Sequence, residues 1–107
     1  MFIDVFNGDA DGIFSLLQMR KAAPVAAKDQ LLISGVKRDN ALIRRISDEQ
    51  AQGAVITALD ISFDKNTADL ERVLNHAESV FYCDHHQAKT LFTHEQLNAV
   101  IDFAPTV

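Results

Sequence analysis

Residues 2–12 read FIDVFNGDADG, a short apolar run that passes directly into a turn carrying two aspartates. The apolar run predicts a buried β-strand at Phe2–Phe6, because short apolar segments bounded by turn signals are typical of strands covered on both faces. Helical apolar spacing follows and predicts a helix from about Asp11 to Ala23, which Pro24 ends. This strand, turn and helix predict an α/β fold whose functional groups lie where the strands end.

The same rhythm continues along the chain. Further apolar runs predict strands at Leu31–Gly35, Ala54–Leu59, Ser79–Cys83 and Ala99–Phe103. Two more helices are predicted between them, one capped by Asn40 and one by Asp64. The residues expected to face the sheet are Ile13, Leu16, Leu17 and Arg20 in the first helix, Leu42, Ile43 and Ile46 in the second, and Ala68, Leu70, Val73 and Leu74 in the third. About five apolar strands joined by helices predict a parallel sheet with helices on both faces, a Rossmann-like three-layer domain.

The composition predicts a single soluble domain over residues 1–107. Of the 107 residues, 48% are hydrophobic and 23% charged, which suits one core. The net charge of −5 excludes general electrostatic attraction to duplex DNA or to anionic membranes. Cys83 is the single cysteine, which excludes an intramolecular disulfide and fits a reducing, cytoplasmic compartment. No apolar run approaches the ~18 residues needed to span a bilayer.

The turn after the first strand carries Asp9 and Asp11, two residues apart. Two close carboxylates repel each other when both are ionised, and a divalent cation stabilises them together. A structural alternative is that both residues cap the following helix and favour its positive end, as acidic residues commonly do. This motif alone favours neither interpretation.

Two other motifs share part of this pattern. An EF-hand loop fits the polar residues Asn7, Asp9, Asp11 and Gly12. Gln18 stands where that loop requires a bidentate Glu, and a predicted strand precedes the loop instead of a helix, so an EF-hand is rejected. The opening Asp-x-Asp-Gly-Thr motif of haloacid-dehalogenase-like phosphatases is also similar, with Ile13 in place of the Thr. A phosphatase of that class is an alternative enzyme on this motif alone.

Polar residues also follow two later strands. Asp60 comes directly after the third predicted strand, where a lone Asp is often only a turn former. Asp84, His85 and His86 follow the fourth. Because the carboxyl ends of parallel strands share one edge of the sheet, these groups are predicted to lie near the aspartates of the first turn. A carboxylate-rich cluster with one imidazole favours Mn²⁺ or Mg²⁺ over zinc.

Three further charged residues have two interpretations each. Lys37 and Arg38 follow the second predicted strand, where they either neutralise a substrate phosphate or are simply solvated. Asp4 lies within the first predicted strand, where it either faces solvent or supports the metal site from behind.

Asn7-Gly8-Asp9-Ala10-Asp11-Gly12, Asp60 and Asp84-His85-His86, in this order, resemble the motifs of the DHH superfamily of phosphoesterases, named after its Asp-His-His triplet. The resemblance covers nearly the whole chain and sets the dehalogenase interpretation aside. It implies these metal ligands: Asp9 for the first ion, Asp11 and His85 for the second, and Asp60 as a bridge. It also implies that His86 faces the substrate phosphate and that Asp84 orients a histidine. Asn7 stands where RecJ-type members carry Asp and is expected to support the site.

The resemblance implies a hydrolase in which two Mn²⁺ or Mg²⁺ ions activate a water. Members of the superfamily include RecJ-type exonucleases, nanoRNases, cyclic-dinucleotide phosphodiesterases and exopolyphosphatases. The expected substrate is therefore a short oligonucleotide, a cyclic dinucleotide or polyphosphate. In the superfamily a fourth-motif Asp and a substrate domain follow the triplet, so this chain is expected to be an amino-terminal part of such an enzyme and poorly active alone. The alternative is a non-catalytic metal- or nucleotide-binding module.

Overall fold

A parallel β-sheet forms the centre of the protein in the computed structural model, which describes residues 1–8, 10–22, 24, 26–35, 41–84 and 94–101. Its strands are β1 (Phe2–Asn7), β2 (Gln30–Gly35), β3 (Val55–Leu59), β4 (Ser79–Asp84) and β5 (Leu97–Ile101). The helices are α1 (Ala10–Ala22), α2 (Asp48–Ala51) and α3 (Phe63–Leu74), with 3₁₀ turns η1 (Ala27–Asp29) and η2 (Leu42–Arg45). No helix in these ranges is long and apolar enough to cross a membrane.

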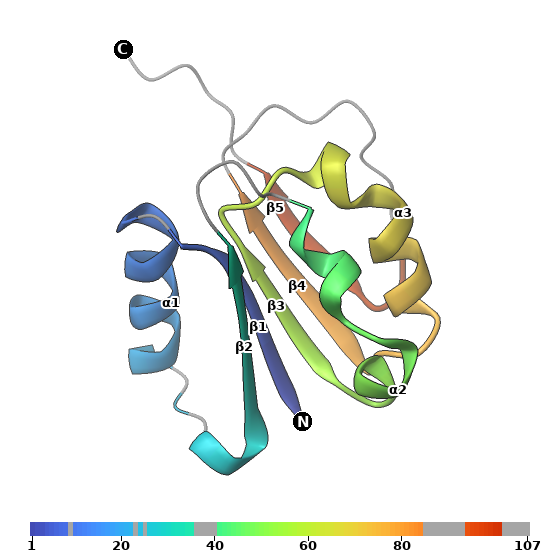
Figure 1. Ribbon diagram of the computed structural model, residues 1–107, viewed down its shortest axis with the longest axis horizontal. Coiled ribbons are helices and arrows are strands. Elements are labelled where there is room, and N and C mark those ends of the chain that lie inside the picture. Colours follow the sequence, from blue (N-terminus) through green and yellow to red (C-terminus); the bar gives the residue numbers. More distant parts are fainter. Residues whose placement is uncertain (9, 23, 25, 36–40, 85–93, 102–107) are drawn as a thin grey trace.

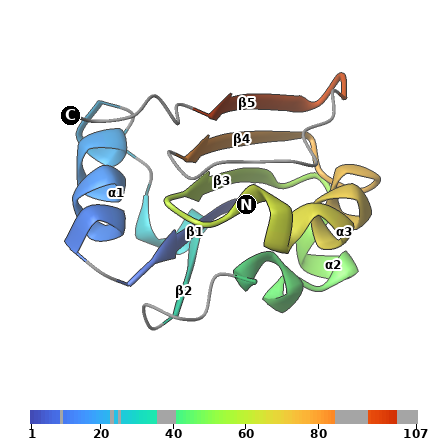
Figure 2. The same ribbon diagram turned by 90° about the horizontal axis from the view of Figure 1, so that it is seen from above.

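The strands lie in the order β2-β1-β3-β4-β5, and every neighbouring pair is parallel. Figure 1 shows α1 on one side of the sheet and α2 and α3 on the other, and Figure 2 shows the strands side by side. The predicted α/β class, with a five-stranded parallel sheet and helices on both faces, is confirmed. From β1 the chain moves out to β2 and then returns to β3, so β1 and β3 flank the point where open parallel sheets bind ligands.

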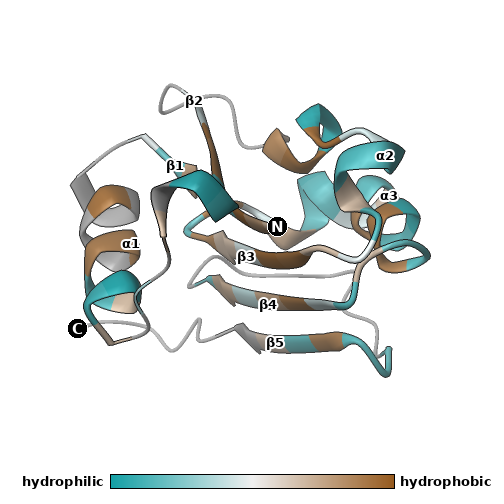
Figure 3. Ribbon diagram, turned by 90° about the horizontal axis from the view of Figure 1, so that it is seen from below, coloured by the Kyte–Doolittle hydropathy of each residue, from teal (hydrophilic) through white to brown (hydrophobic). Residues whose placement is uncertain are grey.

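The two faces of the sheet are covered unequally. The face toward η2, α2 and α3 carries the main core, whose fully buried strand residues include Ile3, Val5, Ile56, Ala58 and Tyr82. On the other face Phe6, Leu16 and Leu59 form a smaller cluster, with Met19 and Cys83 packed against it. Figure 3 shows the hydrophobic segments (brown) of α1 and β3, the elements that meet in this smaller cluster. Among its described side chains, α1 contributes Leu16 and Met19 to this cluster.

The helix α1 is rotated relative to the prediction. Leu16 is buried as expected, but Ile13 and Leu17 are exposed at 43% and 63%. Met19 packs against the smaller cluster instead, whereas Arg20 reaches the sheet as predicted. Met19 and Arg20 follow Leu16 at intervals of three and four residues, so the three lie on one face of the helix. The predicted sheet-facing position of Ile13 and Leu17 is therefore wrong.

The contact of Arg20 is with Asp4, which is buried in β1. Nε of Arg20 donates to Oδ2 of Asp4 at 2.8 Å, and Nη2 pairs with Oδ1. The side-chain amide of Gln30, at the start of β2, also donates to Oδ2. Because alternate strand residues share a face, Asp4 lies on the α1 side together with Phe6. The interpretation in which Asp4 faces solvent is therefore wrong.

The predicted second helix is wrong in form, although its three apolar residues are fully buried. These residues lie on η2 and on the extended residue that follows it, Ile46. Helix begins again only at Asp48, because Ser47 and Gln50 form a capping box, with hydrogen bonds of 3.1 and 2.9 Å. The predicted cap Asn40 lies outside the described residues.

The third helix and the fifth strand begin earlier than predicted. Ser62, not Asp64, is the N-cap of α3, and Asp64 lies in the first turn. Leu70, Val73 and Leu74 are buried as predicted, whereas Ala68 is exposed because Phe63 and Asn66 complete the buried face. β5 begins at Leu97, which pairs with Val80 and packs against the main core.

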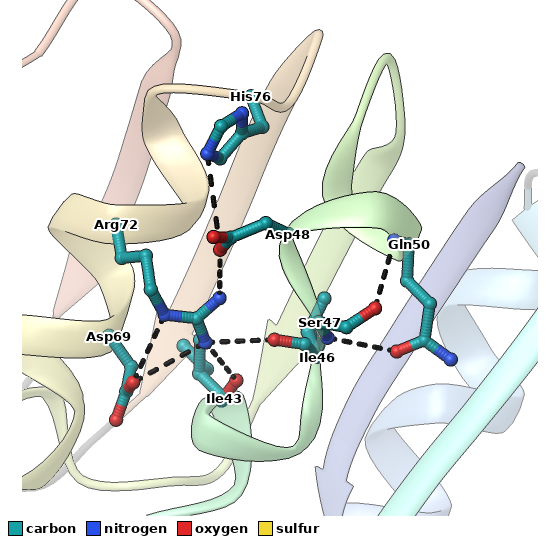
Figure 4. Close-up of polar contacts among 8 residues, drawn as sticks. All are labelled: Ile43, Ile46, Ser47, Asp48, Gln50, Asp69, Arg72 and His76. Atoms are coloured by element: carbon teal, nitrogen blue, oxygen red, sulfur yellow. Dashed lines mark hydrogen bonds and ion pairs between the residues drawn. The ribbon is translucent and has the colours of Figure 1, made fainter.

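Arg72 joins α3 to the segment between η2 and α2 (Figure 4). Its Nη2 donates to the carbonyl oxygen of Ile46 at 2.8 Å, and its Nη1 lies 2.6 Å from Oδ1 of Asp48. Asp69 accepts a longer bond from Nε, and Nε2 of His76 lies 3.9 Å from the same oxygen of Asp48. The guanidinium thus ties the end of η2 and the start of α2 to the outer part of α3 by polar contacts.

Candidate functional site

Three polar residues lie level with one another where neighbouring strands end. Asn7 is the last residue of β1, Asp60 directly follows β3, and Asp84 is the last residue of β4. The register pairs the residues just before them across the three strands. All three side-chain positions are buried, with exposed fractions of 4%, 6% and 4%. Since neighbouring strands lie about 4.8 Å apart, two carboxylates and one carboxamide share a small buried region at the β1/β3 switch point.

The backbone turns sharply at Asp60. Its N–H donates to the carbonyl oxygen of Cys83 at 3.0 Å, which extends the β3–β4 ladder by one residue. Its φ is then 58°, in the left-handed region that few residues other than glycine adopt. Asp tolerates this region better than branched or bulky residues, and such a residue persists only when its surroundings hold it there. The chain therefore leaves the sheet at the position of the second carboxylate.

The negative charges of Asp84 and Asp60 act on Cys83, which directly precedes Asp84 on β4 and pairs with Leu59, the residue before Asp60. Burial raises the pKa of the Cys83 thiol, and the charges of Asp84 and Asp60 raise it further. The thiol therefore stays protonated at neutral pH, as expected of a small half-buried residue rather than of a nucleophile. Burial also raises the pKa of the Tyr82 phenol, with Asp84 adding to the effect, so this hydroxyl stays a hydrogen-bond donor.

The donor atoms of this region suit a hard cation. Oδ1 of Asp60 and Oδ2 of Asp84 are buried and accept no hydrogen bond from the described residues, while both aspartates take part in other interactions. Carboxylate oxygens, together with a carboxamide oxygen such as that of Asn7, are the ligands that Mg²⁺ and Mn²⁺ prefer. A divalent cation also removes the repulsion between two carboxylates on adjacent strands. The residues present therefore fit the predicted type of metal ion.

Gly8 lets the turn after β1 close against the end of β2. Its N–H donates to the carbonyl oxygen of Gly35 at 2.9 Å. A Cβ atom added at Gly8 would lie 2.5 Å from that oxygen, closer than real side chains approach backbone. Only glycine fits this approach, so Gly8 sets the direction in which the chain leaves Asn7.

Gly8→Ala is expected to lower the free energy of unfolding by about 1–3 kcal/mol, because the new methyl group must push two backbone segments apart. Urea unfolding measures the loss, and amide chemical shifts at Asn7 and Gly35 locate it. Gly53→Ala is a suitable comparison, because Gly53 has a φ of 67° but open space around it. That variant is expected to lose stability without shifting the amides at Asn7 and Gly35. A Gly8→Ala protein that keeps both its stability and these shifts would contradict the close approach.

The described structure brings together part of the predicted site. Asn7, Asp60 and Asp84 lie side by side, as the strand-end argument predicts. Asp11 lies in the first turn of α1, and its side chain is not among the described ones. The other predicted site residues lie outside the described residues: Asp9, Lys37, Arg38, His85 and His86. Within the described ranges, no three His, Cys, Asp or Glu side chains form a group that could hold a metal.

Sequence reasoning missed two polar residues next to the site, Tyr82 and Asn66. Both are fully buried inside the main core, and both donate to the turn that follows Asp60. A signal for them existed, because Tyr82 and Asp84 share one face of a buried strand and Asn66 lies three residues after Phe63 on α3. Polar groups at such core positions indicate that specific hydrogen-bond partners are present.

Comparison with known proteins identifies no relative of this chain. No family model matches it, and no curated protein or solved structure matches it either.

Proposed function

We propose that the carboxyl ends of β1, β3 and β4 hold Mn²⁺ or Mg²⁺, and that the chain is a DHH-type metal-dependent phosphoesterase domain. The single observation that supports this most strongly is the level row of Asn7, Asp60 and Asp84, buried at the switch point of a parallel sheet. Two carboxylates buried on adjacent strands repel each other when both are ionised, and a divalent cation bound between them would remove this repulsion.

The proposed ligands extend from this row into the flanking turns. Asp60 is the central one, because β3 lies between β1 and β4. Asp9, Asp11 and His85 are proposed to complete two ion sites, with Asp84 orienting a histidine and His86 directed at the phosphate. When bound, two such ions neutralise phosphate charge and lower the pKa of a water that can attack phosphorus.

The charge of the chain makes a cation necessary for a phosphate ligand. The protein carries a net charge of −5, and the described part of the site adds two carboxylates to the immediate surroundings. Such a region repels phosphate until bound cations reverse the local sign. Lys37 and Arg38 are proposed to assist at the end of β2. The substrate is proposed to be a short oligonucleotide, a cyclic dinucleotide or polyphosphate, and the single cysteine supports a reducing compartment such as the cytoplasm.

Titration of the folded protein with MnCl₂ tests the proposal. We expect saturable binding by calorimetry and a higher melting temperature, because a ligand that binds only the native state stabilises it by about 2.7 kcal/mol at 100 times its Kd. Low, manganese-dependent hydrolysis of bis(4-nitrophenyl) phosphate is expected in addition. NaCl at equal ionic strength is the control for charge screening. A folded protein that does not bind millimolar manganese contradicts the metal site, and binding without hydrolysis above the metal-only rate favours the binding module.

A further inference from the structure

Two polar side chains inside the main core hold the turn Asp60–Ser62, called here the Asp60 turn. The hydroxyl of Tyr82 on β4 donates to the carbonyl oxygen of Ile61 at 2.6 Å. Nδ2 of Asn66 on α3 donates to the carbonyl oxygen of Ser62 at 2.7 Å. Both side chains are completely buried. Consecutive carbonyl groups of the turn therefore each receive a hydrogen bond from the core.

Packing alone does not explain these polar groups. The ring of Tyr82 meets that of Phe63 edge to face, with centroids 5.1 Å apart, and a phenylalanine would make the same contact. A buried hydroxyl or amide is unfavourable unless it is hydrogen-bonded, so apolar residues would fill the same space more simply. The polar atoms of Tyr82 and Asn66 instead fix the orientation of the turn, because each holds one of its carbonyl groups in place.

Asn66 also reaches a second connection of the sheet. Its Oδ1 accepts from the backbone N–H of Ile43 at 3.1 Å, in η2. One side chain thus joins the turn after β3 to the segment that leads from β2 back to β3. Hydrogen bonds therefore hold the Asp60 turn from two sides. One comes from Asn66 on α3, which is also bonded to η2, and the other from Tyr82 on β4.

We propose that Tyr82 and Asn66 are positioning residues of the metal site: by holding the Asp60 turn they keep Asp60 in its left-handed conformation, with its carboxylate beside Asp84. The φ of 58° at Asp60 is unfavourable for a residue other than glycine, so this conformation persists only while the surrounding structure holds it. Its immediate successor, Ile61, is the residue to which Tyr82 is bonded. This inference rests on the proposed metal function for its effect on affinity, but not for its effect on the backbone.

Tyr82→Phe tests the inference, because it removes one oxygen atom and keeps the ring. We expect the affinity for manganese to fall roughly 10-fold, the loss typical of residues that orient metal ligands, with a decrease of only a few degrees in melting temperature. NMR of the metal-free protein gives an independent measure. A left-handed residue shows a strong nuclear Overhauser effect between its own amide and α protons, and we expect this signal at Asp60 to weaken. Asn66→Ala is also expected to lower the manganese affinity and to weaken the Asp60 signal. If the Asn66→Ala protein does not fold, the result for Tyr82→Phe decides.

Val73→Ala is the matched control, because Val73 is fully buried in the same core on α3 but does not contact the Asp60 turn through any described hydrogen bond. It should lower the melting temperature at least as much as Tyr82→Phe while preserving both manganese affinity and the Asp60 signal. Equal loss of affinity in both variants would overturn the inference in favour of general destabilisation. An unchanged Asp60 signal in Tyr82→Phe would overturn it as well. If the parent protein binds no manganese, the proposed function fails, and the Asp60 signal alone decides whether Tyr82 holds the turn.

Discussion

Asp60→Asn is expected to weaken manganese binding by roughly 100-fold or more, while the metal-free protein stays at least as stable as the parent. Asn has the same shape as Asp and also tolerates a φ of 58°, so the turn does not have to change. The substitution removes one of two carboxylates buried on adjacent strands, which lowers the electrostatic repulsion between them in the metal-free protein. It also removes the charge of the proposed central ligand, which should weaken the binding of a divalent cation. A substitution that lowers metal affinity but preserves or raises metal-free stability is typical of a residue that serves function rather than folding.

Calorimetry with MnCl₂ gives the affinity, and urea unfolding in the presence of a chelator gives the metal-free stability. Asp29→Asn is the matched control, because it makes the same change in net charge at an exposed position before β2, at the opposite end of the strands. It should leave the affinity within about twofold of the parent, since exposed distant charges are screened by salt. Equal affinity in Asp60→Asn and the parent would show that Asp60 is not a ligand. A loss of metal-free stability in Asp60→Asn would show instead that its carboxylate holds the turn.

The row at the strand ends could be predicted because it depends on strong, local signals. Apolar runs locate strands to within one or two residues, and parallel strands necessarily end at a common edge. Asn7, Asp60 and Asp84 each follow such a run, so their proximity follows from the strand pattern alone. The conformation of Asp60 could not be predicted in this way. It depends on the phenol of Tyr82, which donates to a carbonyl group 21 residues earlier in the chain. The sequence shows that the phenol is present but not which group accepts its hydrogen bond.

In the helices, too, local features could be predicted from the sequence, whereas contacts between distant residues could not. The capping box of Ser47 and Gln50 lies within four residues and was a readable signal for the start of α2. The rotation of α1 had no such signal. Arg20 faces the sheet as predicted, but its partner Asp4 lies 16 residues earlier in the chain. Apolar spacing alone does not show that Met19, rather than Leu17, packs beside Leu16.

Arg20→Met is expected to lower the free energy of unfolding by about 3 kcal/mol, because it leaves a buried carboxylate without its guanidinium. The side chain of Asp4 is only 1% exposed and that of Arg20 is 17% exposed, so water cannot readily replace the lost partner. Gln30 still donates to Oδ2 of Asp4, which limits the loss. Urea unfolding at neutral pH measures the effect. Hydrogen exchange in α1 should also become faster, because the helix loses its hydrogen bonds to the buried carboxylate on β1.

A double-mutant cycle separates the charge pair from general packing. Asp4→Asn in the Arg20→Met background removes the lone buried charge, so the double variant should be more stable than Arg20→Met alone, with a coupling free energy of about 1 kcal/mol or more. Lys21→Met is the matched control, because Lys21 is an exposed neighbour in the same last turn of α1 and carries the same charge. It should change stability by no more than about 0.5 kcal/mol. Additive losses in the cycle would mean that Asp4 and Arg20 act independently, which would contradict the stabilising effect of their pairing.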